Sequence, residues 1–271
     1  MIFNNTATLA KQIRIHALKM TANAKASHIG SCLSMAELLA VLYEDILRIK
    51  CESPNWEDRD RFILSKGHGA AIYYAVLAEK GFIPKEWLNN FAENDSKLSA
   101  HVNSHNIPGI EVSSGSLGHG LPIACGMALA AIASKKNYKI YVLLSDGELD
   151  EGSNWESILF ASHHKLSNLT TIVDYNKTQG LGDVKKILNL EPLEEKFKAF
   201  GWSSIRVDGH SIHEIHNSLT KMPLIKDKPT VIIADTIKGK GVSFMENSLK
   251  WHYCSPNPDE LKKAISEIEN T

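Results

Sequence analysis

The segment KIYVLLS, residues 139–145, is the feature that most restricts the fold, because it is apolar without alternating polar residues. A strand of this kind is covered on both faces, as the strands of a parallel sheet are. Similar short segments recur along the chain, with helical patterns between them. The predicted strands span residues 61–65, 139–145, 169–176, 204–209 and 229–236. This order predicts an α/β fold, with an open, mostly parallel sheet and helices on both faces.

Helical patterns and end signals fill the intervals between these strands. The predicted helices span residues 6–25, 34–49, 69–81, 121–134, 153–166, 192–200, 211–221 and 258–270. The tetrapeptide from Ser34 to Glu37 has the pattern of a capping box, Gly81 is expected to close its helix, and Pro122 fits only a first turn. Loops, which are often functional when long and ordered, are expected over 94–117, 177–190 and 237–256. No repeat or internal boundary is visible, so we expect a single domain over 1–271.

Composition excludes several classes of protein. The 271 residues are 43% hydrophobic and 23% charged, with a formal net charge of −1, which is typical of a globular protein and gives no reason to expect nucleic acid or an acidic membrane as a partner. No apolar run approaches the roughly 18 residues that span a bilayer, and the N-terminal segment lacks the pattern of a signal peptide. The four cysteines are scattered without a C-x-x-C pair, which favours reduced thiols in a cytoplasmic protein.

An acidic segment, LSDGELDEGSNWE, directly follows the apolar strand 139–145. Asp146 stands at the carboxyl end of that strand, and Asn176 at the carboxyl end of the next one. Ligands of open parallel sheets bind at this edge, so we expect the two side chains to lie close together. Carboxylate and amide oxygens suit Mg²⁺ when phosphates and water complete its ligands. Gly147 would let the backbone approach a ligand closely.

Spacing alone leaves other interpretations of this segment open. Asp146 and Gly147 could form a simple turn, and the remaining acids could be the usual negative bias of a helix N-terminus. A calcium-binding EF-hand loop fits poorly, because Glu151 occupies its glycine position and Ser157 its bidentate position.

Two further patterns point to phosphate and proton chemistry. GSLGHG, residues 115–120, precedes a predicted helix and could hold phosphate through backbone N–H groups, although a packing turn would look the same. Several of the twelve histidines lie in loops beside glycine or serine, where they could transfer protons near neutral pH or simply be solvated. These histidines are His28, His68, His101 and His252. Lys238, after strand 229–236, could add a cation at the same edge or belong to a surface turn.

Taken together, these segments resemble the N-terminal half of transketolase through nearly the whole chain. The resemblance rests on SHIGSCLSMAELLAVLY, DRFILSKGH, GSLGHGLPIACGMALA, SDGELDEGSNWESILFASHHKLSNLTTIVDYN, AFGWSSIRVDGH and DTIKGKGVSFMEN…KWH. The fourth segment matches the thiamine diphosphate fingerprint, G-D-G followed at a fixed interval by N. The resemblance therefore implies the thiamine diphosphate-binding fold, with thiamine diphosphate and Mg²⁺ (or Ca²⁺ or Mn²⁺) as cofactors.

The resemblance also implies roles for individual residues. The metal would be held by Asp146, Asn176 and the backbone carbonyl of Thr178. The cofactor would be contacted by Ser31, His68, Gly115, Ser116, Leu117, Asp146, Gly147, Asn176, Lys238 and His252. The catalytic residues, which would handle protons of the sugar hydroxyls, would be His28, His68, His101 and His252. Glu151 and Glu156 would lie at a contact with another chain.

The chain departs from the family pattern at a few positions. Ser145 replaces the first glycine of the fingerprint, Ile29 a common proline, and His119 a common glutamine. Tyr253 replaces a common glycine beside His252, and we expect it to narrow the substrate channel.

In this family a second domain covers the cofactor's aminopyrimidine and supplies a glutamate, and no such segment is recognisable in residues 1–271. We therefore expect the N-terminal subunit of a split transketolase, inactive until it joins a C-terminal subunit with the pyrimidine-binding domain. Together they would pass a two-carbon ketol unit from a ketose or its phosphate to an aldose, as a two-fold heterotetramer, in pentose phosphate or more specialised carbohydrate metabolism. Alternatives are a 1-deoxyxylulose-phosphate synthase-like or 2-oxoacid dehydrogenase-like enzyme, which would release CO₂, or a non-catalytic cofactor-binding module.

Overall fold

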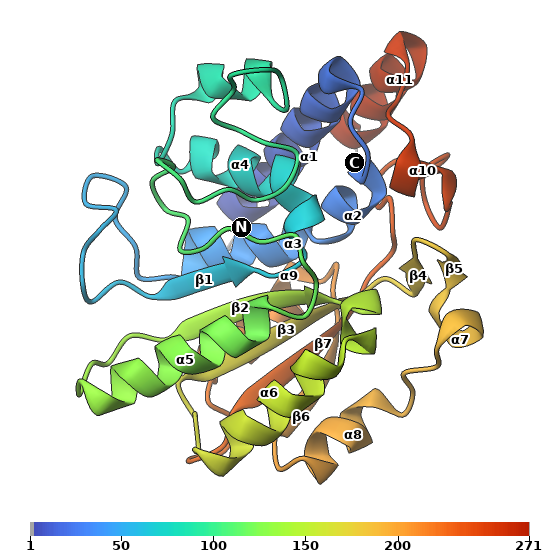
Figure 1. The fold of residues 1–271 in the computed structure, drawn as a ribbon. Helices are drawn as coiled ribbons and strands as arrows, with labels where there is room; N and C mark the ends of the chain where they lie inside the picture. The colour runs from blue at the N-terminus through green and yellow to red at the C-terminus, as the bar shows by residue number, and fades with distance from the viewer. Residues whose placement is uncertain (1–2, 271) are drawn as a thin grey trace.

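Five parallel strands form the central sheet of the protein, seen in a computed structural model that describes residues 3–270 (Figure 1). In spatial order these strands are β1 (Arg61–Leu64), β2 (Ile140–Ser145), β3 (Leu169–Tyr175), β7 (Thr230–Asp235) and β6 (Ser203–Asp208). Each of the five predicted strands is present, with ends that differ by a residue or two. The parallel sheet confirms the predicted fold class.

Strand β2 is buried along its whole length, and its side chains divide between two cores. Tyr141 and Leu143 pack into the core on one face, while Ile140, Val142 and Leu144 pack into the core on the other. Successive side chains of a strand point to opposite faces, so a strand that is covered on both sides needs apolar residues at every position. The missing alternation in KIYVLLS has this cause.

Helices cover both faces of the sheet (Figure 1). The first face carries α1 (Asn4–Ala24), α3 (Ala36–Val41), α4 (Ala70–Glu79), α9 (Ile212–Thr220) and α11 (Pro258–Glu269). The second face carries α5 (Gly120–Ala133), α6 (Gly152–His163) and α8 (Leu193–Ala199). The shorter elements are α2 (Ile29–Ser34), η1 (Leu42–Ile46), η2 (Gly67–Gly69), η3 (Lys85–Asn90), η4 (Gly147–Asp150), β4 (Thr178–Gln179), β5 (Gly182–Asp183), α7 (Val184–Ile187) and α10 (Lys250–Tyr253). Across residues 3–270 every helix is too short or too polar to cross a membrane.

Two predicted end signals are confirmed, and a further one, at Asn257, was not predicted. Gly81 follows the C-cap residue of α4 and adopts a φ of 79°, and Pro122 lies in the first turn of α5. Asn257 and Glu260 form a capping box at the start of α11, at the predicted position of the last helix.

The predicted capping box from Ser34 to Glu37 is wrong. Residues 29–34 form the separate helix α2, and α3 begins at Ala36 without a side-chain cap. Ser34 donates its hydroxyl to Asp174, and Glu37 binds Arg14. Tertiary partners therefore take both side chains that a local box would have used. The predicted helix 34–49 is also shorter, since η1 ends at Ile46.

Of the three predicted loops, only 94–117 lacks helices and strands. The segment 177–190 contains the β4–β5 hairpin and α7, and the segment 237–256 contains α10. Both segments leave the sheet from its carboxyl edge and lie on the same side of the molecule (Figure 1). This edge holds the candidate site.

Candidate active site

A cavity of about 340 Å³ lies at the carboxyl ends of β2 and β3. Its walls come from the loops after four strands and from α2 and α10. The predicted site residues that line it are His28, Ser31, His68, His101, Gly115, Leu117, Asp146, Gly147, Asn176, Thr178, Lys238 and His252. Ser145, Gln179 and Gly180 complete the lining, whereas Ser116 is exposed to solvent and does not take part. Residues from six segments of the sequence thus meet in one cavity.

Asp146 is buried at the end of β2 and is linked to the loop after β3. Its two carboxylate oxygens accept hydrogen bonds from the backbone N–H groups of Gly147, at 2.7 Å, and Lys177, at 2.6 Å. Burial and the charge of Asp174 raise the pKa of Asp146 to about 6, although these two N–H groups oppose the shift. A buried carboxylate in this state gains from a nearby cation.

The oxygen donors around Asp146 fit a hard metal ion. The Asn176 amide oxygen accepts the Thr178 N–H at 3.1 Å, which fixes the turn on which Thr178 lines the cavity. Carboxylate, amide and carbonyl oxygens together suit Mg²⁺ or Ca²⁺ and do not suit zinc. Within residues 3–270 no group of three His, Cys, Asp or Glu side chains is placed to hold a metal, so these mixed oxygen donors are the relevant set.

Lys238 brings a buried ammonium group to the same wall. Its Nζ donates to the Thr178 carbonyl at 2.8 Å and lies 3.0 Å from Nδ1 of His252. Burial and the charge of Lys66 lower the pKa of Lys238 to about 8. A bound anion would reverse this shift, since negative charge favours the protonated amine.

The four histidines singled out in the sequence form one cluster. The ring centre of His28 lies 5.1 Å from that of His68, 5.8 Å from that of His101 and 4.8 Å from that of His252. Burial, followed by neighbouring positive groups, lowers the pKa of His28 to about 4 and that of His252 to about 3. Burial and Lys66 also hold the pKa of His68 well below its usual range. These lowered pKa values favour the neutral imidazole near pH 7, and each neutral ring has one nitrogen that can accept a hydrogen bond from a hydroxyl group.

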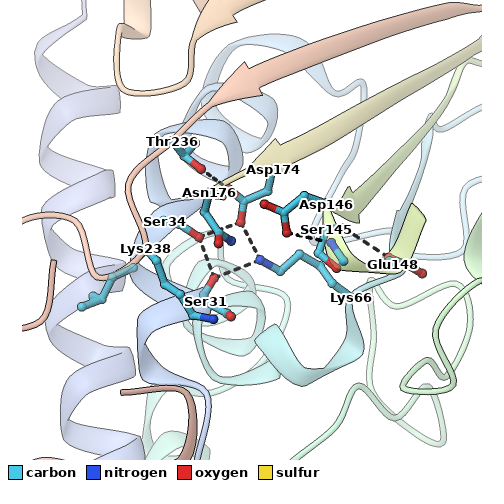
Figure 2. A network of polar contacts seen from close by, with 12 residues as sticks. Ser31, Ser34, Lys66, Ser145, Asp146, Glu148, Asp174, Asn176, Thr236 and Lys238 are labelled. Atoms are coloured by element: carbon cyan, nitrogen blue, oxygen red, sulfur yellow. Dashed lines mark hydrogen bonds and ion pairs between the residues drawn. The ribbon is translucent and has the colours of Figure 1, made fainter. Parts of the chain in front are cut away.

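A buried ion pair lies beneath the cavity, and it was not predicted. Lys66 donates to Asp174 at 2.5 Å and to the Ser31 carbonyl at 3.1 Å, and both charged side chains are fully buried. Figure 2 shows Lys66, Ser34 and Thr236 converging on the Asp174 carboxylate. A signal was available in the sequence, because an aspartate inside the apolar strand LTTIVDY needs a cationic partner.

Glu148 is the second functional candidate that sequence reasoning missed. Its carboxylate accepts the Ser65 hydroxyl, the Gly118 N–H at 2.9 Å and the Ser145 N–H at 3.2 Å. It therefore joins the ends of β1 and β2 to the glycine loop 115–120. The acidic segment divides in two, since Asp146 and Glu148 point inward while Asp150, Glu151 and Glu156 are exposed.

The glycine loop 115–120 passes close to the start of α6. Gly118 has a φ of 80°, and a Cβ there would lie 2.5 Å from Oγ of Ser153. The same Ser153 hydroxyl donates to the Gly118 carbonyl at 2.7 Å. Only glycine fits this close approach, which brings Gly115 and Leu117 to the cavity.

Tyr253 extends from α10 across the edge of the cavity. Its hydroxyl donates to the Gly180 carbonyl at 2.7 Å, and its ring centre lies 4.8 Å from that of His252. The residue is 58% exposed. It stands where the resemblance leads to glycine, in contact with Gly180 of the cavity lining.

Comparison with known proteins gives one consistent result. The family described as "Transketolase, thiamine diphosphate binding domain" matches residues 5–268. One of the subunits of the apulose-4-phosphate transketolase from Actinobacillus succinogenes is 44% identical, covering 96% of this chain and 95% of that protein. The 6-deoxy-6-sulfo-D-fructose transketolase subunit of a Clostridium species is 40% identical, covering 96% and 94%.

Full-length transketolases match over part of their length. Human transketolase is 41% identical, with 94% of this chain aligned to 40% of that protein. The crystal structure of transketolase from Campylobacter jejuni superposes with a TM-score of 0.93 at 32% identity, covering 99% of this chain and 43% of that chain. The chain thus spans about two fifths of these longer relatives and nearly all of the subunits named above.

Proposed function

The chain belongs to the transketolase family through its thiamine diphosphate-binding domain, and from this premise we propose that it is one subunit of a ketol-transferring enzyme. The enzyme would move a two-carbon glycolaldehyde unit from a ketose, or ketose phosphate, to an aldose. One observation carries the proposal: the cluster of four imidazoles opens onto the same cavity as Asp146, Asn176 and Lys238. Proton acceptors for sugar hydroxyls thus lie beside oxygen donors for a metal and a cation for phosphate.

We assign the metal, Mg²⁺ or a related ion such as Ca²⁺ or Mn²⁺, to the Asp146 carboxylate, the Asn176 amide oxygen and the Thr178 carbonyl. The cofactor's diphosphate would be bound by residues from five segments. These residues, which all line the cavity, are Ser31, His68, Gly115, Leu117, Gly147, Lys238 and His252. When bound, the thiazolium ring supplies the electron sink for breaking a carbon–carbon bond.

The protein's own contribution is to orient the sugars and to hold protons. Neutral imidazoles of His28, His68 and His252 can take protons from hydroxyl groups of the donor and return them to the acceptor. A bound diphosphate would raise the pKa of each, since it places negative charge nearby. His101, 5.8 Å from His28, would extend this proton-handling surface toward the mouth.

We further propose that activity requires a second chain with the pyrimidine-binding domain, and that 1–271 is a single diphosphate-binding domain. Two relatives covered over at least 94% of their length are named as transketolase subunits, which supports a two-chain enzyme. Exposed apolar side chains on the adjacent helices α5 and α6 support self-association about a two-fold axis, giving a heterotetramer. These side chains are Ile123, Ile132, Leu159 and Phe160. Four free cysteines support a cytoplasmic location.

The test is ketol transfer by the complex. The tagged chain would be purified gently from its source cells together with any retained chain, and supplied with thiamine diphosphate, Mg²⁺ and an isotopically labelled aldose phosphate. Donors would include a common ketose phosphate, apulose 4-phosphate and 6-deoxy-6-sulfo-D-fructose, after the names of the relatives. A labelled product two carbons longer supports the proposal, and the D146N variant, purified in the same way, should not form it.

Other outcomes would contradict the proposal. Release of CO₂ from a 2-oxoacid, with no ketol transfer, would point to a decarboxylating enzyme of the wider cofactor class. Cofactor binding by the complex without turnover of any donor would point to a binding module.

A further inference from the structure

The segment after β7 determines where the Lys238 ammonium group lies, and its backbone is held at three points. The Gly239 N–H donates to the Gly30 carbonyl at 2.9 Å, and the Lys238 carbonyl accepts the Asn247 N–H at 2.9 Å. The third point is Ile237, the residue before Lys238. It lies beyond the last sheet hydrogen bond of β7, so its N–H has no strand partner.

A histidine side chain accepts this N–H. Nε2 of His210, in the turn after β6, lies 2.8 Å from the backbone nitrogen of Ile237. An N–H group can donate only to the ring nitrogen that carries the lone pair. The proton of the neutral imidazole is therefore on Nδ1, which lies 3.1 Å from Oε2 of Glu37.

Glu37 is fixed in turn by Arg14, so the ring has a defined orientation. Both terminal nitrogens of Arg14 donate to the Glu37 carboxylate at 2.6 Å, and all three side chains are largely buried. Burial alone would raise the pKa of Glu37, but Arg14 and His210 hold it at about 2. The carboxylate thus stays an acceptor for Nδ1–H, and this selects the tautomer in the same way that a carboxylate orients a metal-binding histidine.

We infer that His210 is a positioning residue for the cofactor site: in its Nδ1–H tautomer it accepts the Ile237 N–H and so fixes the segment that presents Lys238. The expected consequence is a change in affinity for the cofactor's diphosphate, and this consequence rests on the proposed function. His210 does not line the cavity, so its effect passes through the backbone of Ile237. Loss of the acceptor would leave a partly buried N–H unpaired and allow Lys238 to move.

Two substitutions separate the two ring nitrogens. The amide of glutamine reaches the position of Nε2, so H210Q can still accept the Ile237 N–H. The amide of asparagine reaches only the position of Nδ1, so H210N keeps a donor for Glu37 and loses the acceptor. The exposed His213 on α9 provides the matched control, H213N.

The experiment measures thiamine diphosphate activation of the purified complex at fixed Mg²⁺. We expect H210N to raise the KM for the cofactor roughly ten-fold, with a much smaller effect on kcat at saturation, whereas H210Q and H213N stay within about two-fold of the wild type. Equal effects of H210N and H210Q, of any size, would overturn the inference. A loss confined to kcat would overturn it as well.

A second measurement does not require H210N to fold. In the wild-type chain labelled with ¹⁵N-histidine, the ring signals of His210, identified by their absence in H210Q, should show a protonated Nδ1 and an unprotonated Nε2. The opposite tautomer would refute the inference even if H210N does not fold. Failure of the proposed function is a distinct result, because the wild-type complex would then show no ketol transfer while the tautomer of His210 is as stated.

Discussion

Replacing Lys66 by methionine tests the buried ion pair beneath the cavity. Methionine has a similar length and no charge, so the change removes the cation with little change in volume. Asp174 would keep the hydroxyl groups of Ser34 and Thr236 as donors but lose its counter-ion. Loss of the cationic partner of a fully buried carboxylate strongly destabilises the folded state.

The size of the effect follows from burial. Both side chains are fully buried, and breaking such a pair by removing one member costs about 3–5 kcal/mol. The total free energy of unfolding of a domain is roughly 5–15 kcal/mol, so K66M should lose a large share of it. The double variant K66M/D174N leaves no buried charge. Ser34 and Thr236 donate to different oxygens of Asp174, so the amide oxygen would accept from one hydroxyl group and the amide NH₂ would donate to the other after its rotation. We expect it to recover at least about 2 kcal/mol relative to K66M.

The contribution of Asp174 to the free energy of unfolding should depend on pH with opposite signs in K66M and in the wild type. Burial would raise the pKa of Asp174, but Lys66 and hydrogen bonds hold it below its ordinary value. In the wild type its stabilising contribution is thus full above about pH 4 and is lost as pH falls below that. In K66M only the hydroxyl groups of Ser34 and Thr236 still oppose the effect of burial, so the pKa of Asp174 rises. Lowering the pH from 7 towards 5 then protonates the carboxyl group and restores stability.

Urea unfolding followed by tryptophan fluorescence gives the free energies at pH 7 and pH 5 for the wild type, both variants and D174N. We expect the midpoint of K66M to fall by roughly 1 M at pH 7 and the deficit to shrink at pH 5. The reasoning is refuted if K66M loses less than about 1 kcal/mol at pH 7. It is also refuted if the double variant is no more stable than K66M.

Further predictions concern the metal, the anion and the glycine loop. Mg²⁺ should raise the melting temperature at pH 7 and much less at pH 5, because the pKa of Asp146 is raised to about 6 and the folded chain offers the metal a carboxylate only above that pH. Without metal, the raised pKa costs stability progressively as pH rises from about 4 to about 6, and the cost is full above that range. An equal rise in D146N would contradict the metal assignment. Affinity for thiamine diphosphate, measured by calorimetry, should fall as pH rises through the Lys238 pKa of about 8, and K238M should bind roughly ten-fold more weakly without this alkaline decline. G118A should lose about 1–3 kcal/mol in urea unfolding, because its Cβ would lie 2.5 Å from Ser153, while G152A, whose Cβ meets nothing within 4 Å, should lose little.

Periodicity and end signals predicted most of the fold. The burial of strand 139–145 could be predicted from its own residues, because a strand that is covered on both faces needs apolar side chains throughout. A second rule places Asp146 and Asn176 at one edge of the sheet: the carboxyl ends of neighbouring parallel strands lie side by side. The cavity there contains every predicted site residue except Ser116.

The capping box at Ser34 failed for a different physical reason. Its four residues carry a valid local pattern, but local hydrogen bonds compete with tertiary ones. Ser34 is recruited by Asp174, 140 residues away, and Glu37 by Arg14. A sequence pattern that covers one helical turn cannot show that its side chains form hydrogen bonds with distant residues.

Residues beneath the cavity escaped prediction because their partners are distant in the chain. Ser65 reaches Glu148 over 83 residues, and Lys66 reaches Asp174 over 108. No period relates such pairs, and each residue alone looks like an ordinary turn or helix-start residue. Only the general rule that a charge inside an apolar strand needs a partner could have indicated one of them, Asp174.

The two groups of charges at this edge differ in what compensates them. Lys66 and Asp174 neutralise each other, so their pairing is complete without a ligand. Asp146 and Lys238 instead have pKa values shifted toward their neutral forms, Asp146 upward and Lys238 downward, chiefly by burial. A metal ion would relieve the first shift and an anion the second. Because the metal also attracts the anion, a metal ion and a diphosphate would each strengthen the binding of the other. The ion pair of Lys66 and Asp174 beneath them would keep its charges and its position.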